Sequence, residues 1–168
     1  MKRFLVLTFL ILPGLFLAAQ DYNKSIGIRG GLSSGFEYRF FTDDANSIKF
    51  LLGINNEGDD RGFRLHALKE FHHYQLFTFT DQLVFFWGAG IHAGFESWDK
   101  VHYRDGTSWY DTRTALVVGL DGLAGLEYVF YEAPISVGLE VKPFIDVLGH
   151  EMFRLQPFDF AFTIKYLF

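Results

Sequence analysis

The sequence predicts a single all-β domain, an eight-stranded antiparallel up-and-down barrel that crosses a membrane. Three observations predict this fold. Apolar side chains recur at every second position over eight segments, charged side chains fall on the opposite face with nearly balanced signs, and the chain opens with an apolar segment of the export type. A period of two is that of a β-strand, because successive side chains point to opposite faces of a sheet.

The composition narrows the classes of protein further. Of the 168 residues, 49% are hydrophobic and 19% aromatic, so the chain has far more apolar surface to bury than a disordered one. The chain has no cysteine, which excludes disulfide scaffolds, thiol chemistry and cysteine-ligated zinc. The formal net charge of −5 argues against a nucleic-acid partner, since such proteins carry a basic surface.

The first segment, residues 1–19, is predicted to be a cleaved signal peptide. Lys2 and Arg3 precede an apolar run that ends at Leu17, and the small residues Ala18 and Ala19 follow. The alternative is an uncleaved membrane anchor, but the apolar run is shorter than the roughly 20 residues that a spanning helix needs. Residues 20–168 then form one exported barrel domain.

The first four predicted strands span residues 25–32, 36–41, 47–55 and 63–77. In each, the apolar side chains alternate with polar or small ones, as in a strand with two unlike faces. These apolar residues are Ile26, Ile28 and Leu32 in the first, Phe36, Tyr38 and Phe40 in the second, Ile48, Phe50, Leu52 and Ile54 in the third, and Phe63, Leu65, Ala67 and Phe71 in the fourth.

The last four predicted strands span residues 83–95, 115–131, 135–147 and 158–168. The sixth is almost wholly apolar, but its charges Asp121 and Glu127 share one face of a strand, whereas on a helix they would lie about 120° apart. The other three alternate, with apolar residues Phe85, Trp87, Ala89, Ile91, Ala93 and Phe95, then Ile135, Val137, Leu139, Val141, Ile145 and Val147, and finally Phe158, Phe160, Phe162, Ile164, Tyr166 and Phe168.

The connections favour the same topology. The longest predicted loop, residues 96–113, follows the fifth strand. In an even-stranded barrel with both termini in the periplasm, long loops follow odd strands and short turns follow even ones. The position of this loop therefore agrees with a count of eight strands.

The polar faces are predicted to point inward and the apolar faces outward to lipid, the reverse of a water-soluble barrel. The polar faces are rich in glycine, which suits a cramped interior, and aromatic residues end the apolar faces as interfacial girdles do. An unpaired buried charge is costly, so we expect the inward charges to form an ion-pair network that plugs the narrow lumen. Its predicted members are Arg29, Glu37, Arg39, Lys49, Arg64, Glu70, Asp121, Glu127, Glu140, Lys142, Asp146, Asp159 and Lys165.

A family resemblance rests on four stretches and the last residue. The stretches are residues 26–31 (IGIRGG), 88–95 (GAGIHAGF), 125–128 (GLEY) and 139–143 (LEVKP), and the chain ends in Phe168. By these stretches, residues 20–168 resemble the small eight-stranded outer-membrane barrels of the OmpA/OmpX type, and among them short barrel proteins of Bacteroidota. The resemblance implies a place in the outer membrane, in contact with its lipids. It also implies that the barrel-assembly machinery reads the closing alternation Phe160, Phe162, Ile164, Tyr166 and Phe168.

Two residues depart from the simple pattern. Pro143 lies inside the seventh predicted strand and requires a bulge or a missing ladder bond, because proline has no N–H to donate. Lys69 points outward, where its ammonium must reach the membrane interface or meet a partner protein. Small outward residues around it (Ala67, Ala89, Ala93, Gly122 and Ala124) suggest a flat surface on which another barrel could dock.

The lumen histidines are the first candidates for chemistry. A turn near residue 79 places His66 opposite His92 on neighbouring strands, and with Glu70 they form a candidate transition-metal site. The favoured alternative is that His66, His72 and His92 hydrogen-bond to lumen carboxylates, since the sequence contains no dense ligand motif. No cofactor is therefore predicted.

Carboxylates and serines are the other candidates. Asp121, Glu127, Glu140 and Asp146 could serve general acid–base chemistry, or pair with bases such as Arg29 and Lys142. A loop centred near residue 150 would place Lys142 opposite Asp159. A lipid hydrolase needs a Ser–His–acid arrangement, but Ser47 and Ser136 are expected to be isolated on the lumen side, and no G-x-S-x-G motif exists.

The predicted loop 96–113 contains the aromatic residues Trp98, His102, Tyr103, Trp109 and Tyr110. Exposed aromatic residues could form a recognition surface or continue the membrane girdle, and the sequence leaves both interpretations open. The function predicted from the whole is a non-catalytic outer-membrane barrel with a structural role or an accessory role in a larger envelope complex. The alternatives are a lipid- or lipopolysaccharide-modifying enzyme and a narrow pore or small-ligand barrel.

Overall fold

The computed structural model describes residues 22–57, 60–104, 107–150 and 153–168. The predicted signal peptide, residues 1–19, lies outside them. Among the described residues, no helix has the length and apolarity needed to cross a membrane. The strands are β1 (Lys24–Gly31), β2 (Ser33–Phe41), β3 (Asn46–Glu57), β4 (Asp60–His73), β5 (Leu83–Arg104), β6 (Thr107–Val129), β7 (Ile135–Val141), β8 (Phe144–Leu148), β9 (Arg154–Gln156) and β10 (Phe160–Leu167).

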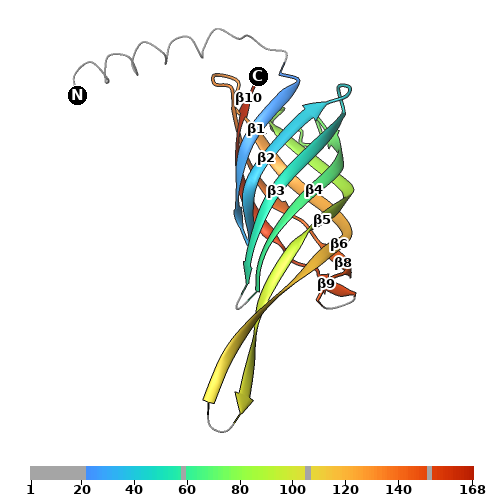
Figure 1. Ribbon diagram of the computed structural model, residues 1–168. Coiled ribbons are helices and arrows are strands. Elements are labelled where there is room, and N and C mark those ends of the chain that lie inside the picture. Colours follow the sequence, from blue (N-terminus) through green and yellow to red (C-terminus); the bar gives the residue numbers. More distant parts are fainter. Residues whose placement is uncertain (1–21, 58–59, 105–106, 151–152) are drawn as a thin grey trace, which may run out of the picture.

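These ten segments close into an eight-stranded antiparallel barrel (Figure 1). The seventh barrel strand consists of β7 followed by β8, and the eighth consists of β9 followed by β10. Strands that follow one another along the chain pair with each other, and β1 pairs with β10 to close the barrel, with Ile28 opposite Ile164. The predicted fold class, strand count and up-and-down topology are therefore confirmed.

Proline interrupts the seventh barrel strand at the predicted place. The strand breaks between Val141 and Phe144, at Lys142 and Pro143, and the Pro143 carbonyl accepts a hydrogen bond from the Gly122 amide. Val141 pairs with Phe160 on one side of the break, and Phe144 pairs with Gln156 on the other. Two residues on the seventh strand therefore face three on the eighth, which is a β-bulge.

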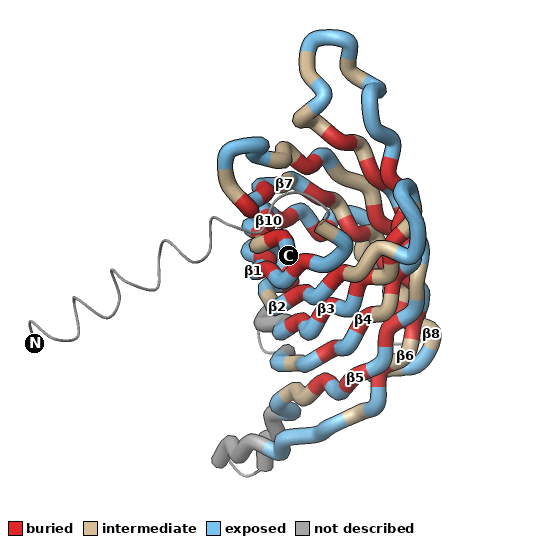
Figure 2. The backbone as a smooth tube through the Cα atoms, turned by 90° about the horizontal axis from the view of Figure 1, so that it is seen from above, coloured by how far each residue is buried: buried red, intermediate tan, exposed pale blue. Residues whose placement is uncertain are grey.

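The outer wall of the barrel is apolar and the lumen is polar. Ile28 and Ile164 are 53% and 54% exposed, and Phe162 is 73% exposed. The structure places all thirteen charged residues of the predicted network in the buried interior. Figure 2 shows the resulting alternation of buried and exposed residues along the barrel strands. A water-soluble barrel would have the opposite arrangement, with the aromatic side chains converging inside.

The lumen is not wholly polar. The alternation of the sequence does not predict the apolar side chains that point into it. Leu68, Phe86 and Leu123 form a buried apolar cluster among the charges. The Phe86 ring occupies space that a larger residue at position 125 would need, since a Cβ on Gly125 would lie 2.6 Å from Phe86 Cζ. The glycines of the inward faces thus make room for large side chains from neighbouring strands.

The prediction that residues 96–113 form a loop is wrong. β5 and β6 continue through it as paired strands, from Ser97 opposite Thr114 to Arg104 opposite Thr107. The resulting hairpin projects past the other strands at the end of the barrel away from the termini (Figure 1). A two-stranded ribbon that projects past the other strands is open to solvent on both faces, so it needs no apolar alternation and its charged sequence resembles that of a loop. The fourth strand also ends earlier than predicted, at His73 rather than residue 77.

The outer wall generates a first prediction. Ile164 lies midway along β10, opposite Ile28 of β1 and Val137 of β7. Replacing Ile164 with Arg should lower the free energy of unfolding by about 2–4 kcal/mol, because the charge would then face hydrocarbon. Urea unfolding of the protein refolded in lipid vesicles measures the effect.

The matched control is Glu132→Lys, in the exposed connection between β6 and β7, which should change the free energy of unfolding by less than about 0.5 kcal/mol. Equal effects of the two substitutions would show that the outer wall at Ile164 does not contact lipid.

Candidate functional site

The lumen carries the chemically active side chains of this protein, in two connected ion-pair networks. The proximal network lies toward the termini. It surrounds the Phe86 ring, with the charged groups of Arg39, Lys49 and Lys165 at 5.3, 5.9 and 5.4 Å from the ring centroid. Cations over an aromatic face are attracted by the ring quadrupole, so Phe86 stabilises this cluster of positive charge.

Carboxylates complete the proximal network. The shortest N···O distances are 2.7 Å from Arg39 to both Glu70 and Glu127, 3.0 Å and 2.7 Å from Lys49 to Glu37 and Glu140, and 3.0 Å from Lys165 to Glu127. Lys165 also lies 3.4 Å from Glu37, so each of the three cations bridges carboxylates from at least two different strands. The predicted alternative, carboxylates paired with bases, is the arrangement seen.

The distal network lies toward the hairpin. Lys142 lies 3.3 Å from Asp159 and 3.6 Å from Asp121, and its amide donates to the Asp159 carbonyl, so the predicted register of these two residues is confirmed. Arg64 lies 3.2 Å from both Glu96 and Asp146. Arg29 joins the networks, at 2.6 Å from Glu140 and 3.2 Å from Asp159.

Glu96 is a lumen residue that the sequence analysis missed. It is buried, pairs with Arg64, and accepts a hydrogen bond from the His150 amide. The period of two contains a signal for it, because Glu96 follows His92 and Gly94 at intervals of two residues on the inward face. The prediction omits Glu96 from the lumen because the predicted loop begins at the same residue.

His66 and His92 lie opposite each other on β4 and β5, as the turn position predicts. Their ring centroids are 5.2 Å apart. Asp121 of β6 bridges the two rings, with Oδ2 at 2.9 Å from His66 Nδ1 and Oδ1 at 3.1 Å from His92 Nδ1. His92 Nε2 lies 2.8 Å from Asp146 Oδ1.

The third residue of the predicted metal site, Glu70, does not join the two histidines. Glu70 lies four residues from His66 along β4, which on a strand is about 13 Å. It instead pairs with Arg39 and accepts a hydrogen bond from the Ser47 hydroxyl at 2.9 Å. Asp121 takes its place beside the imidazoles.

Ser47 is not isolated, contrary to the prediction. Its Oγ lies 2.9 Å from His72 Nε2 as well as 2.9 Å from Glu70 Oε2. The three groups do not form a catalytic triad, because Glu70 faces the same ring nitrogen as the serine, at 3.6 Å, and so cannot orient the imidazole from its other side. Ser47 is also fully buried, which leaves no room for a substrate at its oxygen.

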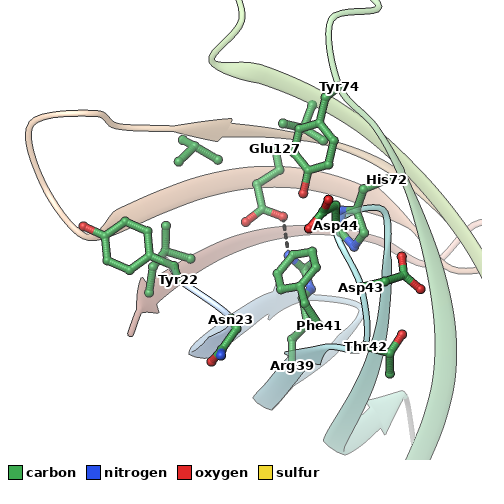
Figure 3. A pocket seen from close by; sticks show the side chains of 13 residues that line it. Tyr22, Asn23, Arg39, Phe41, Thr42, Asp43, Asp44, His72, Tyr74 and Glu127 are labelled. Carbon is green, nitrogen blue, oxygen red and sulfur yellow. Dashed lines mark hydrogen bonds and ion pairs between the residues drawn. The ribbon is translucent and has the colours of Figure 1, made fainter. Parts of the chain in front are cut away.

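A cavity of about 520 Å³ lies at the end of the barrel that carries the termini (Figure 3). Arg39, His72 and Glu127 form its inner part, and Tyr74 and the turn after β2 form its rim. Arg39 is held there by its hydrogen bond to Glu127, drawn in Figure 3. Such a cavity could take a small polar molecule, but the residues that line it include no serine or cysteine nucleophile.

The pKa values of two titratable groups at this cavity, Tyr74 and Asp43, are shifted. Burial raises the pKa of the Tyr74 phenol, which therefore stays protonated at neutral pH. The Ala45 amide and the Asn46 side chain donate hydrogen bonds to the Asp43 carboxylate and lower its pKa. Asp43 thus stays ionised and caps the turn between β2 and β3.

The outward residues with predicted roles lie where the alternation places them. Lys69 is exposed, with its ammonium 5.3 Å from the centre of the Phe71 ring. Phe71 stacks on Trp87 at 4.6 Å, and the Trp87 indole donates to His73 Nε2 at 2.9 Å, so these rings form one contiguous group on the outer wall. The residues of the predicted assembly signal, Phe160, Phe162, Ile164, Tyr166 and Phe168, share the outward face of the last strand.

In the projecting hairpin, Trp98 is half-buried because its ring packs on His150 at 3.8 Å between centroids. Thr112 donates to Asp99 at 2.6 Å across the ribbon. The other four predicted recognition residues, His102, Tyr103, Trp109 and Tyr110, have their backbones in β5 and β6, and their side chains lie outside the described residues.

The fold is shared with two small barrels of known structure. The N-terminal β-barrel domain of Pseudomonas aeruginosa OprF aligns with a TM-score of 0.52 and 13% identity over 89% of this chain and 100% of that domain. Neisserial surface protein A (NspA) aligns with a TM-score of 0.58 and 10% identity over 86% of this chain and 93% of NspA. No protein-family model and no curated protein sequence matches the chain. The chain therefore has the fold of the small eight-stranded outer-membrane barrels of the OmpA type.

The proximal network generates a second prediction. Lys49→Met should lower the free energy of unfolding by about 3–5 kcal/mol, because it leaves Glu37 and Glu140 buried without this cation. Equilibrium urea unfolding in vesicles measures the loss.

The matched control is Lys69→Met on the outer wall, which unpairs no buried carboxylate and should be neutral or stabilising. If both substitutions had the same small effect, the lumen ion pairs would not stabilise the barrel.

Proposed function

We propose that this protein is a non-catalytic outer-membrane barrel with a side-chain plug, which acts as an accessory subunit of a larger envelope complex. In this proposal the β5–β6 hairpin is its contact element outside the membrane. The observation that carries the proposal is the combination of a lumen filled with ion pairs and a single long projection. Three features of this protein remain predictions: its similarity to short Bacteroidota barrels, its export by residues 1–19 and its assembly through the closing aromatic strand.

The contents of the lumen support a barrel that does not conduct. Six buried cations and eight buried carboxylates point inward among the described residues, together with the Leu68–Phe86–Leu123 cluster. Eight strands enclose an interior only wide enough for side chains to fill. An open water path through this barrel would require several of these ion pairs to separate.

The hairpin supports a role in binding a partner. β5 and β6 have 22 and 23 residues, whereas about 9–11 residues suffice to cross a membrane. Beyond Ser97, β5 pairs with β6 alone among the described residues, so its other edge is available there. Edge strands bind partners by adding a strand, which gives the hairpin a physical means of recognition.

The alternative of a lipid-modifying enzyme is not favoured by the geometry. Ser47, His72 and Glu70 are close together, but Glu70 and Ser47 approach the same imidazole nitrogen and the serine is fully buried. The alternative of a small-ligand barrel has support from the cavity beside Arg39, which we regard as the second candidate.

The contact role is tested by shortening the hairpin without changing its register. Trp98 and Arg113 are paired across the ribbon, so residues 99–112 can be replaced by Asn-Gly, which forms a two-residue turn between paired strands. Wild-type protein extracted from its native membrane should run as a complex of fixed mass and stoichiometry, and the shortened protein should run alone.

Heat-modifiable gel migration must show that the shortened barrel still folds. As a matched control, Thr112→Ala, which removes one hydrogen bond but keeps the ribbon, should leave the complex intact. Recovery of the wild-type protein as a lone monomer would contradict the accessory role.

The plugged lumen is tested by electrical recording. The purified barrel in planar bilayers should give no discrete conductance steps at neutral pH, because ion pairs cross the lumen in both networks. A wide porin in the same bilayers is the positive control. Steady single-channel steps from the wild-type protein would favour the narrow-pore alternative instead.

A further inference from the structure

We infer that His66, His92 and Asp121 form a buried binding site for one divalent transition-metal cation of the Zn²⁺ type. Asp146 acts in it as a positioning residue. The inference is independent of the proposed accessory role, since it concerns the lumen rather than the hairpin. It differs from the site predicted from the sequence in its carboxylate ligand, which is Asp121 rather than Glu70.

The donor atoms are close enough to share one ion. One ligand atom from each of the three residues lies within 4.8 Å of the other two. Zinc bonds to imidazole and carboxylate of about 2.0–2.1 Å place the ligand atoms of a tetrahedral site about 3.3 Å apart. The two observed contacts, 2.9 Å from Asp121 to His66 and 3.1 Å from Asp121 to His92, are within a few tenths of an ångström of that spacing.

The orientation of the His92 ring is compatible with metal ligation. Metal-ligating histidines generally donate their second ring N–H to a carboxylate, which fixes the tautomer and the ring orientation. His92 has this arrangement, because its Nδ1 faces Asp121 while its Nε2 lies 2.8 Å from Asp146. Asp146 therefore holds the His92 ring with Nδ1 turned toward His66 and Asp121.

Gly119 leaves space for the His92 imidazole, because a Cβ at this position would overlap the ring. All three ligand residues are buried, so bulk water would not reach an ion bound there, and one trapped water or the second Asp121 oxygen would be its fourth ligand. The ligands come from β4, β5 and β6, and an ion would therefore link three neighbouring strands.

The charge of the lumen favours a cation. Among the described residues, six buried Arg and Lys side chains face eight buried carboxylates, an excess of two negative charges when the histidines are neutral. Arg154, which is partly exposed and 3.8 Å from Glu96, offsets at most one of them. A divalent ion brings the lumen to within one charge of neutrality, which lowers the cost of burying these carboxylates.

Among the described residues, Lys142 is a further charged group that faces one of these ligands. Lys142 Nζ lies 3.6 Å from Asp121 Oδ1, but it is closer to Asp159, at 3.3 Å, and can stay paired there when Asp121 binds an ion. Without a metal, the excess charge would be met by a proton, with His92 as an imidazolium between Asp121 and Asp146. These two states, metal and proton, are the outcomes that the experiment separates.

The test uses the full-length mature barrel without an affinity tag, refolded in detergent and dialysed against Zn²⁺ and then against metal-free buffer. Elemental analysis should find one zinc per chain. The Co²⁺ form should show the visible absorption of a four-coordinate ion with nitrogen and oxygen ligands. Zinc should also raise the temperature of unfolding relative to protein treated with a chelator, because the site exists only in the folded barrel.

The variants identify the ligands. His66→Gln/His92→Gln should lose the stoichiometric zinc, whereas His73→Gln, at the exposed histidine beside Trp87, should keep it. Asp146→Asn should keep one zinc per chain but bind it about 10- to 100-fold more weakly, as expected for a residue that orients a ligand. Heat-modifiable migration shows which variants fold.

The inference is overturned if folded wild-type protein holds no stoichiometric zinc and shows no Co²⁺ absorption, which would leave the proton as the compensating charge. It is also overturned if the folded double variant keeps its zinc. If the double variant does not fold, Asp146→Asn and the wild-type Co²⁺ spectrum still decide the question. None of these measurements depends on a partner, so the accessory role can fail without affecting them.

Discussion

The structure depends on one constraint, the pairing of charges inside a tube too narrow to hydrate them. The pairs cross the lumen and join residues far apart in the chain, such as Arg29 and Glu140, which are 111 positions apart, and Lys49 and Glu140, which are 91 apart. Each pair therefore ties one wall of the barrel to another. Breaking such a pair leaves a buried charge with reduced compensation, so the network opposes both opening and misregistration of the strands.

The same constraint limits where a ligand or partner can bind. Because the lumen is filled, a ligand or partner must bind at an end of the barrel, on the outer wall or within a site that replaces part of the network. Among the described residues, the cavity beside Arg39, the β5–β6 hairpin and the His66–His92–Asp121 cluster each satisfy this condition. Each uses the rigid barrel as a frame, and only the hairpin reaches well beyond it (Figure 1).

The errors of prediction share a physical origin. Alternation identifies a strand only where its two faces differ, so the hairpin beyond Ser97, which is open to solvent on both faces, gives no strand signal and is predicted as a loop together with Glu96. Alternation also states which residues point inward without stating how far apart they lie across the lumen. Glu70 was therefore grouped with His66 from the same strand, although Asp121, two strands away, is the carboxylate that reaches both rings. Ser47 was judged isolated for the same reason.

The amino-acid order by itself determined the strand count, the inward and outward faces and the registers that place His66 opposite His92 and Lys142 opposite Asp159, because a period of two and the turn positions suffice for these. It also determined the break at Pro143, since proline has no amide proton to donate. Only the tertiary structure decided which charges meet, that Phe86 lies among the cations, and that the fifth and sixth strands run on past the barrel. Those features depend on closure, which brings walls from distant parts of the chain within contact distance, and no local pattern encodes that distance.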